Sequence, residues 1–326
     1  MVEIVKTEVN ITRINVKKHR QRKEEKDKLK MEYYMSKVIV IDSSGLYFPA
    51  VFSWERQIIK QQETNSDMFI MSPIQVYFSS LISCLKKIGV DEDTKVIIAL
   101  EGKSWRKKYY APYKAQREGD RQKHEAIDWD KCFKELNDFH DLLDRTTDWQ
   151  FIREWDSECD DILSVACRHF KDDEVIIVSG DGDLKQLAYY ENVRFFNIYK
   201  KCKGSRGMYE LISNPLKILA DKAKKGDVSD NIIPSINDTE EDFELRYMLV
   251  NLLKLPVEIE DSITNEFKKL KNKEKHLAQM PFTKMADKFL TIYDKKYQIT
   301  EEYCHALETK RIQRKKKEKI EKKKIK

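Results

Sequence analysis

The chain has 326 residues, enough for one large or two small domains with a sizeable core. It contains no apolar run close to the roughly 18 residues of a membrane span, and its charged first segment lacks the apolar stretch of a signal peptide, so we expect a soluble cytoplasmic protein without a membrane partner. Six cysteines without a CxxC pair argue against a zinc ribbon or a disulfide framework and indicate reduced thiols.

The net charge of +6 is distributed unevenly. Residues 310–326 carry a net charge of +9 and residues 1–37 carry +5, which leaves −8 for the stretch between them. Basic ends around an acidic middle suit a polyanionic partner held near a metal-loaded site. The alternative is a pair of solvated tails with no partner. We therefore expect a charged extension at residues 1–35 and a basic tail at residues 310–326.

The first strand is expected at residues 37–42. A helix follows at 73–88, with Ser72 as N-cap, Pro73 at its first position and Gly89 after its end. Further strands are expected at 95–100, 150–155, 175–178 and 192–198, with a helix at 156–170. Strands that alternate with helices predict an α/β fold, a mostly parallel sheet flanked by helices, over roughly residues 36–200. The rest is expected to be helical.

Acidic residues follow three of the expected strands. Asp42 ends the first, Glu101 follows the second, and the pair Asp181 and Asp183 follows the strand at 175–178. The helix after the third strand opens with three more acids, where the helix dipole favours negative charge: Glu158, Asp160 and Asp161. Because the carboxyl ends of parallel strands form one edge of a sheet, we expect these seven acids to converge there. The alternative is seven separate caps and turns.

Crowded carboxylates repel one another unless cations neutralise them, and oxygen ligands select hard ions such as Mg²⁺, with Mn²⁺ as a substitute. Two such ions about 4 Å apart can activate a water and stabilise both oxygens of an in-line displacement at phosphorus. Phosphodiester hydrolysis fits this pattern best. In "KKGDVSDN", Asp227 and Asp230 either complete a metal site or cap a helix.

The segment "GKSWRKKYYAPYKAQREGDRQK" interleaves eight basic residues with four aromatic ones. Basic side chains grip phosphates and aromatic faces stack on unpaired bases, so we expect single-stranded nucleic acid to bind here. The alternative is a solvated loop. We expect Lys114 and Arg117 to be exposed, and the candidate contacts are Arg106, Lys107, Lys108, Tyr113, Lys114 and Arg117.

Five segments spanning roughly residues 37–235 carry a family resemblance: "VIDSSG", "WRKKYYAPYKAQR", "ECDD", "VIIVSGDGDLKQL" and "KKGDVSDN". Together they resemble the 5′ nuclease superfamily of flap endonucleases, most of all the ribonuclease H (5′-3′ exonuclease) group of T-even-type bacteriophages. The resemblance implies a PIN-like nuclease domain at residues 36–205 with an arch at about 103–125. It also implies a helical duplex-binding region at 206–309, with a helix-three-turn-helix variant and a K⁺ ion.

The same resemblance implies roles for individual residues. One metal ion would be held by Asp42, Glu101, Glu158, Asp160 and Asp181, with Asp161 just outside, and a second by Asp183, Asp227 and Asp230. Arg106, Lys114 and Arg117 would contact phosphates, Arg106 and Lys114 would take part in catalysis, and Tyr113 would stack on a base. The implied protein is a monomeric, metal-dependent nuclease with ribonuclease H and 5′-flap endonuclease activity. It would remove RNA primers during phage-type lagging-strand replication in the host cytoplasm.

The implied substrates are DNA and RNA–DNA hybrids with 5′ ends or flaps, and the implied protein partners are a single-strand-binding protein or a sliding clamp. Two features depart from the family pattern: Glu101 stands where aspartate is more usual, and the glycine-rich turn after the second group of aspartates is absent. The alternatives are a catalytically silent nucleic-acid-binding module and a PIN-type RNA-cleaving nuclease. A haloacid-dehalogenase-type phosphatase would need an acid two residues after Asp42, where Ser44 stands.

Overall fold

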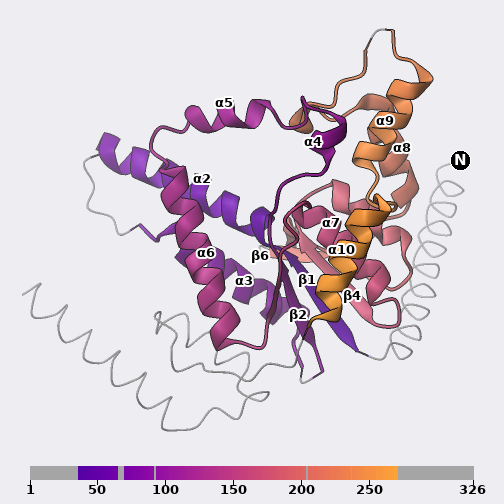
Figure 1. Ribbon diagram of the computed structural model, residues 1–326. Coiled ribbons are helices and arrows are strands. Elements are labelled where there is room, and N and C mark those ends of the chain that lie inside the picture. The colour runs from indigo at the N-terminus through magenta and orange to yellow at the C-terminus, as the bar shows by residue number, and fades with distance from the viewer. Residues whose placement is uncertain (1–35, 65–69, 92, 203–204, 236, 271–326) are drawn as a thin grey trace, which may run out of the picture.

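The computed structural model describes residues 36–64, 70–91, 93–202, 205–235 and 237–270 (Figure 1). Within them a six-stranded sheet has the order β3-β2-β1-β4-β5-β6. The strands are β1 (Lys37–Asp42), β2 (Lys95–Ala99), β3 (Gln150–Ile152), β4 (Glu174–Ser179), β5 (Val193–Cys202) and β6 (Ser205–Glu210). All neighbours are parallel except β5 and β6, which are antiparallel, so the predicted mostly parallel sheet is confirmed.

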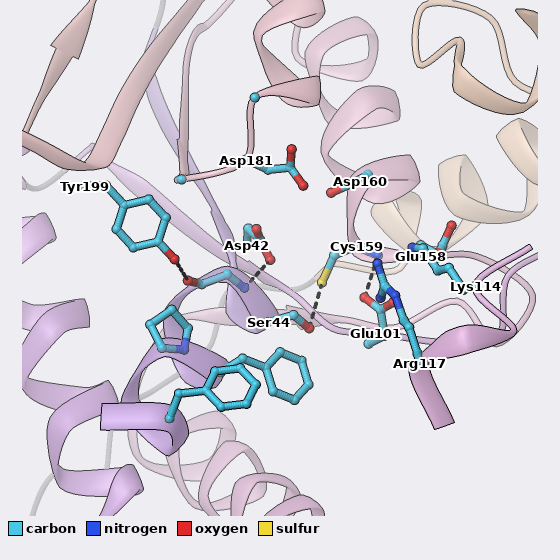
Figure 2. A pocket seen from close by; sticks show the side chains of 16 residues that line it. Asp42, Ser44, Glu101, Lys114, Arg117, Glu158, Cys159, Asp160, Asp181 and Tyr199 are labelled. Atoms are coloured by element: carbon cyan, nitrogen blue, oxygen red, sulfur yellow. Dashed lines mark hydrogen bonds and ion pairs between the residues drawn. The ribbon is translucent and has the colours of Figure 1, made fainter. Parts of the chain in front are cut away.

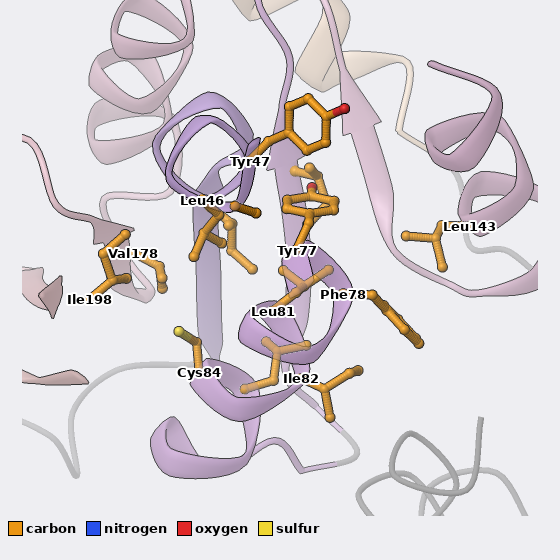
Figure 3. Packing of buried hydrophobic residues seen from close by; sticks show 14 of the residues in the cluster. Leu46, Tyr47, Tyr77, Phe78, Leu81, Ile82, Cys84, Leu143, Val178 and Ile198 are labelled. Atoms are coloured by element: carbon orange, nitrogen blue, oxygen red, sulfur yellow. The ribbon is translucent and has the colours of Figure 1, made fainter. Parts of the chain in front are cut away.

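Helices cover both faces of the sheet. Helices α2 (Ser43–Thr64), α3 (Pro73–Ile88) and α6 (Trp129–Thr146) pack on one face, over Ile39 and Ile41 of β1 (Figure 3). Helices α7 (Cys159–His169) and α10 (Val257–Lys268) and the 3₁₀ helix η1 (Asp183–Tyr189) pack on the other face, over Val38 and Val40. Because successive side chains of a strand point to opposite faces, a run of β-branched residues such as that in β1 fills both cores.

Several element boundaries differ from the sequence-based expectation. Strand β3 ends at Ile152 instead of 155, and α7 begins at Cys159 with Glu158 as its N-cap. The expectation that the chain after about residue 200 is entirely helical is wrong, because β6 pairs with β5 at the sheet edge. This edge strand is stabilised by pairing with a distant partner, so its own short, polar sequence gives little indication of it.

A third core joins the second half of the chain to the arch. Helices α8 (Pro215–Lys225) and α9 (Glu240–Val250) flank the short 3₁₀ helix η2 (Val228–Asp230). Tyr113 packs in this core with Leu219 and Leu249. After α8, Gly226 adopts a φ of 73°, a conformation that favours glycine, and a Cβ there would collide with the Ile232 carbonyl oxygen. The tight turn thus brings Asp227 and Asp230 next to the arch.

The arch contains α4 (Arg106–Tyr109) and α5 (Gln116–Gln122). In Figure 1 α4 lies beside α9, and α5 extends toward the end of α2 and α6. At its far end, His124 Nδ1 lies 2.7 Å from Glu55 Oε2 of α2. The arch therefore bridges the two sides of the molecule above the carboxyl ends of the strands.

No helix in the described part of the chain has the length and apolar character needed to cross a membrane. Cys84, Cys132, Cys159 and Cys167 are free and buried, as expected for reduced thiols. The predicted extension at 1–35 and the predicted tail at 310–326 lie outside the described residues, as do Cys304 and the side chain of Cys202.

Candidate active site

Five of the predicted acids meet in one pocket of about 550 Å³ at the carboxyl edge of the sheet (Figure 2). They come from three strand ends and from the start of α7, and they are Asp42, Glu101, Glu158, Asp160 and Asp181. The basic side chains of Lys114 and Arg117 line the same pocket from the arch. The predicted convergence therefore holds for these five acids.

Two hydrogen bonds hold Asp42 in place. Its buried carboxylate accepts hydrogen bonds from the Gly45 backbone N–H at 2.8 Å and from Ser179 Oγ at 2.7 Å. A Cβ atom at Gly45 would collide with that carboxylate, so glycine is required here. The "VIDSSG" segment thus folds its own glycine onto its aspartate, and Ser179 at the end of β4 holds the other oxygen.

Burial, and after it the charge of neighbouring acids, changes the pKa values of these carboxyl groups. Exclusion of water, followed by the charges of Asp181 and Asp42, raises the pKa of Asp160. Burial likewise raises the pKa of Asp42 above its usual range, despite the hydrogen bonds that it accepts. Exclusion of water around its carboxyl group and the charge of Glu158 raise the pKa of Glu101 to about 7. A cation bound between such carboxylates would relieve their repulsion and stabilise their ionised forms.

Glu158 differs from the other four because it has several polar partners of its own. Arg106 Nη1 and Tyr113 Oη donate to its Oε2 at 2.9 and 2.8 Å, and Lys114 Nζ pairs with its Oε1. Burial alone would raise the pKa of Glu158, but the charges of Lys114 and Arg106 outweigh it and bring the pKa to about 2. Glu158 is therefore ionised, and it ties the base of the arch to α7.

Asp161 does not line the pocket. It is fully buried behind Glu158, where its two oxygens accept hydrogen bonds from the Arg106 guanidinium at 2.7 and 3.0 Å. Trp105 Nε1 donates to the same carboxylate at 3.2 Å. Asp161 thus anchors the start of the arch.

Asp183, Asp227 and Asp230 form a second group beside the pocket. Lys222 of α8 makes ion pairs with Asp183 and with Asp227, the latter at 2.5 Å. Burial raises the pKa of Asp227, but hydrogen bonds from Lys222 and Ser229 outweigh it and hold the pKa below its usual range. Lys222 was missed by sequence reasoning, although the basic residues just before "GD" were a weak signal of it.

The donors suit a hard divalent cation, since all are carboxylate oxygens. Among the described residues, however, no three His, Cys, Asp or Glu side chains lie close enough together to hold one metal ion. Lys114 and Lys222 instead occupy positions between carboxylates, pairing with Glu158 and Asp230 and with Asp183 and Asp227 respectively. The ammonium groups of these two lysines neutralise part of the negative charge of the carboxylates.

The structure places several arch residues differently from the sequence-based expectation. Lys107, Lys108 and Arg117 are exposed, but the Lys114 side chain is only 13% exposed, so the expectation for Lys114 is wrong. Arg106 and Tyr113, predicted to contact a phosphate and a base, are buried with their polar ends on Glu158. In the run "WRKKYY", Trp105 and Arg106 are buried against the acids of α7, and the next three residues are exposed.

The arch also docks on the turn around η2. Lys114 donates its backbone N–H to the Asp230 carbonyl oxygen at 2.9 Å, and Asn231 Nδ2 donates to the Pro112 carbonyl oxygen at 2.9 Å. Arg117 Nη2 donates to Asp230 Oδ1 at 2.9 Å. Lys114 and Asn231 both have φ near +55 to +60°, in the left-handed region that non-glycine residues seldom adopt. Residues keep such a strained backbone conformation only where neighbouring contacts stabilise it, and the hydrogen bonds between the arch and the η2 turn do so here.

A parallel sheet with acids gathered at its carboxyl edge, under a basic arch, defines a PIN-like nuclease fold. Residues 37–214 match the family described as 5′-3′ exonuclease, N-terminal resolvase-like domain, and the chain belongs to this family. It is thus a 5′ nuclease, a phosphodiester hydrolase. A search of the curated proteins finds no match.

Two solved structures of bacteriophage T5 proteins share this fold. The T5 5′-exonuclease with bound zinc ions is 18% identical with a TM-score of 0.54, over 72% of this chain and 99% of that one. The T5 flap endonuclease in a complex with DNA and metal ions is 18% identical with a TM-score of 0.52, over 72% of this chain and 98% of that one.

Proposed function

We propose that this chain is a divalent-metal-dependent 5′-3′ nuclease with ribonuclease H and 5′-flap endonuclease activity, which removes RNA primers in phage-type lagging-strand replication. The observation that carries the proposal is the pocket in which five carboxylates face Lys114 and Arg117. Acids suited to cations stand opposite basic groups suited to a phosphate. The T5 relative bound to DNA and metal ions supports the same substrate class.

Two Mg²⁺ ions, with Mn²⁺ as a substitute, fit the two acidic groups. Asp42, Glu101, Glu158, Asp160 and Asp181 would hold the first, and Asp183, Asp227 and Asp230 the second. When bound, the ions supply Lewis acidity and neutralise charge at the scissile phosphate.

Protein side chains would bind the phosphate and position the metal-binding carboxylates. Lys114 and Arg117, on the pocket wall, would bind the phosphate oxygens and stabilise charge that develops on them. Ser179 and Gly45 keep the Asp42 carboxylate in one orientation. Arg106 positions Glu158 and the arch through contacts that keep its guanidinium buried.

The region with α8, η2 and α9 would bind duplex DNA or RNA–DNA hybrid through the backbone, with a K⁺ ion at the turn. Its exposed lysines at the end of α8, Lys224 and Lys225, suit phosphate contacts. A single-strand-binding protein or a sliding clamp is the proposed partner, and the chain is expected to act as a monomer.

The test is cleavage of three 5′-labelled substrates, a DNA flap, an RNA–DNA hybrid and single-stranded RNA, with Mg²⁺ or with excess chelator. Asp181→Ala should abolish cleavage and leave binding in chelator intact. The matched control is Asp172→Ala, an exposed aspartate just before β4, at the opposite edge of the sheet from Asp181. Cleavage by Asp181→Ala at the wild-type rate would refute the site. Cleavage of single-stranded RNA alone would favour a PIN-type RNA nuclease.

A further inference from the structure

Strand β5 has an irregular stretch beside the active-site pocket. Between residues 197 and 201, three residues of β5 stand opposite the single residue Gly207 of β6, so the backbone of β5 bulges. The Asn197 side chain stabilises the bulge, because its Oδ1 accepts hydrogen bonds from the backbone N–H groups of Tyr199 at 2.9 Å and Lys200 at 3.2 Å. A bulge bends its strand and redirects a side chain. Here the Tyr199 side chain lines the active-site pocket.

The Tyr199 ring covers Gly180, the residue directly before Asp181. A Cβ atom added to Gly180 would collide with three carbon atoms of the ring, so the ring lies against this glycine. The φ angle of Gly180 is not positive, so its backbone conformation would accept an alanine without strain. The close approach of Tyr199 is therefore what requires glycine at this position.

The hydroxyl end of Tyr199 contacts the segment that holds Asp42. Its Oη donates a hydrogen bond to the Gly45 carbonyl oxygen at 3.3 Å, and the N–H of the same glycine donates to the Asp42 carboxylate (Figure 2). Burial, and after it the charges of Asp42 and Asp181, raise the pKa of Tyr199, in keeping with a phenol close to both carboxylates. Figure 2 shows this side chain on the side of the pocket opposite the basic residues of the arch.

Tyr199 thus contacts the glycines that lie beside two of the acids. Asp42 ends β1 and Asp181 follows β4, and the charge of Asp181 acts on the Asp42 carboxyl group. Ser179 joins the two from the buried side, since its Oγ donates to Asp42 at 2.7 Å and accepts from the Asp181 N–H at 3.0 Å. Tyr199, which is 48% exposed, joins them from the solvent side. Residues that orient metal-binding carboxylates from behind in this way tune metal affinity.

We propose that Tyr199 is a positioning residue of the nuclease site, which holds Asp42 and Asp181 at the separation at which both bind one metal ion. The inference rests on the proposed function, since the two acids share the first metal ion there. The ring acts through Gly180 and the hydroxyl acts through Gly45. This role requires no contact between Tyr199 and nucleic acid.

The test combines Tyr199→Ala with Gly180→Ala, which displaces the ring without removing it. Each variant should raise the Mg²⁺ concentration at half of the Mg²⁺-induced rise in melting temperature about tenfold, and lower turnover of a 5′ DNA flap about tenfold. The double variant should also change about tenfold instead of about a hundredfold, because both substitutions remove the same contact. Flap binding in excess chelator should stay within about twofold of wild type in all three, since no contact with the strand is lost.

Three further variants serve as controls. Tyr199→Phe keeps the ring on Gly180 and loses only the hydrogen bond to Gly45, so its turnover should stay within about threefold of wild type. Tyr189→Ala removes a tyrosine of η1 that is similarly exposed, at 52%. Gly182→Ala adds a Cβ atom that meets nothing within 4 Å, at a φ of −69° that suits alanine. The last two should respond to Mg²⁺ like wild type.

Effects that multiply in the double variant, or an unchanged Mg²⁺ response of Tyr199→Ala, would overturn the proposal. Weaker flap binding by Tyr199→Ala in chelator would also overturn it, because the ring would then contact the strand. If the wild type neither cleaves nor responds to Mg²⁺, the proposed function fails, and the positioning role fails with it. Melting in chelator still measures the contact itself, since Gly180→Ala should lower the melting temperature of the wild type but not that of Tyr199→Ala.

Discussion

Arg106 binds Asp161 with both ends of its guanidinium group, at 2.7 and 3.0 Å, and both side chains are buried. The same arginine donates from Nε to the Leu249 carbonyl oxygen at 2.7 Å. One side chain therefore joins the arch, the start of α7 and the end of α9. This makes Arg106 a structural residue of the site.

Replacing Arg106 with methionine should lower the free energy of unfolding by about 3–5 kcal/mol, because Asp161 would be left buried without its partner. Denaturant unfolding in chelator measures this loss. Arg117→Met is the control, since Arg117 is 47% exposed and pairs with Asp230 at 2.9 Å, and it should cost less than about 1 kcal/mol. Equal losses in the two variants would contradict the structural role of Arg106.

Lys114 and Arg117 should both contribute to turnover, but only Lys114 should also contribute to the stability of the fold. Arg117→Met should reduce turnover by about 10²-fold through lost phosphate stabilisation, with little effect on folding. Lys114→Met should reduce turnover and also destabilise the protein by about 1–3 kcal/mol, because Lys114 is largely buried on Glu158. Single-turnover kinetics and denaturant unfolding of both variants provide the comparison. Unchanged stability of Lys114→Met would mean that its ion pair is not maintained in solution.

Lys222 is expected to compete with the second metal ion for the carboxylates of Asp183 and Asp227. In Lys222→Met, Asp183 and Asp227 lose the cation that neutralises them, so the metal-free protein should melt at a lower temperature than wild type. Mg²⁺ should then raise the melting temperature of the variant more than that of wild type, because binding to the folded state stabilises it. Lys217→Met, which breaks an exposed pair with Asp221 on the same helix, is the control. An identical Mg²⁺ response in all three proteins would exclude metal binding by Asp183 and Asp227.

His140 predicts a defined pH dependence of stability. Burial lowers its pKa from 6.5 to about 3, so between these values the unfolded state binds a proton that the folded state does not. The neutral His140 ring therefore makes its full contribution to the free energy of unfolding above about pH 6.5. This contribution is lost as the pH falls toward 3, with a slope approaching about 1.4 kcal/mol per pH unit. Unfolding free energies of wild type and His140→Gln over this range isolate the effect. Parallel curves for the two proteins would show that His140 does not remain neutral.

Much of the sheet and of the acidic pocket is predictable from the sequence. The β-branched runs of β1 and β4 fix buried parallel strands, and such strands place Asp42 and Asp181 at one edge whatever the rest of the chain does. The start of α7 was recognisable from its acids, and they lie where a helix N-terminus favours them. Strand β6 and helix α2 were not predicted, because pairing and packing with distant segments stabilise them.

The sequence by itself determined which acids could meet, since strand periodicity, strand ends and helix starts are properties of short stretches. Only the tertiary structure decided which basic groups neutralise them. Arg106 and Asp161 are 55 residues apart in the chain, and Lys222 bridges Asp183 and Asp227 from another helix. The cavity next to the active-site pocket likewise exists only because α2, α6 and the arch come together. Burial and ion pairing depend on long-range packing, and no short stretch of sequence contains that information.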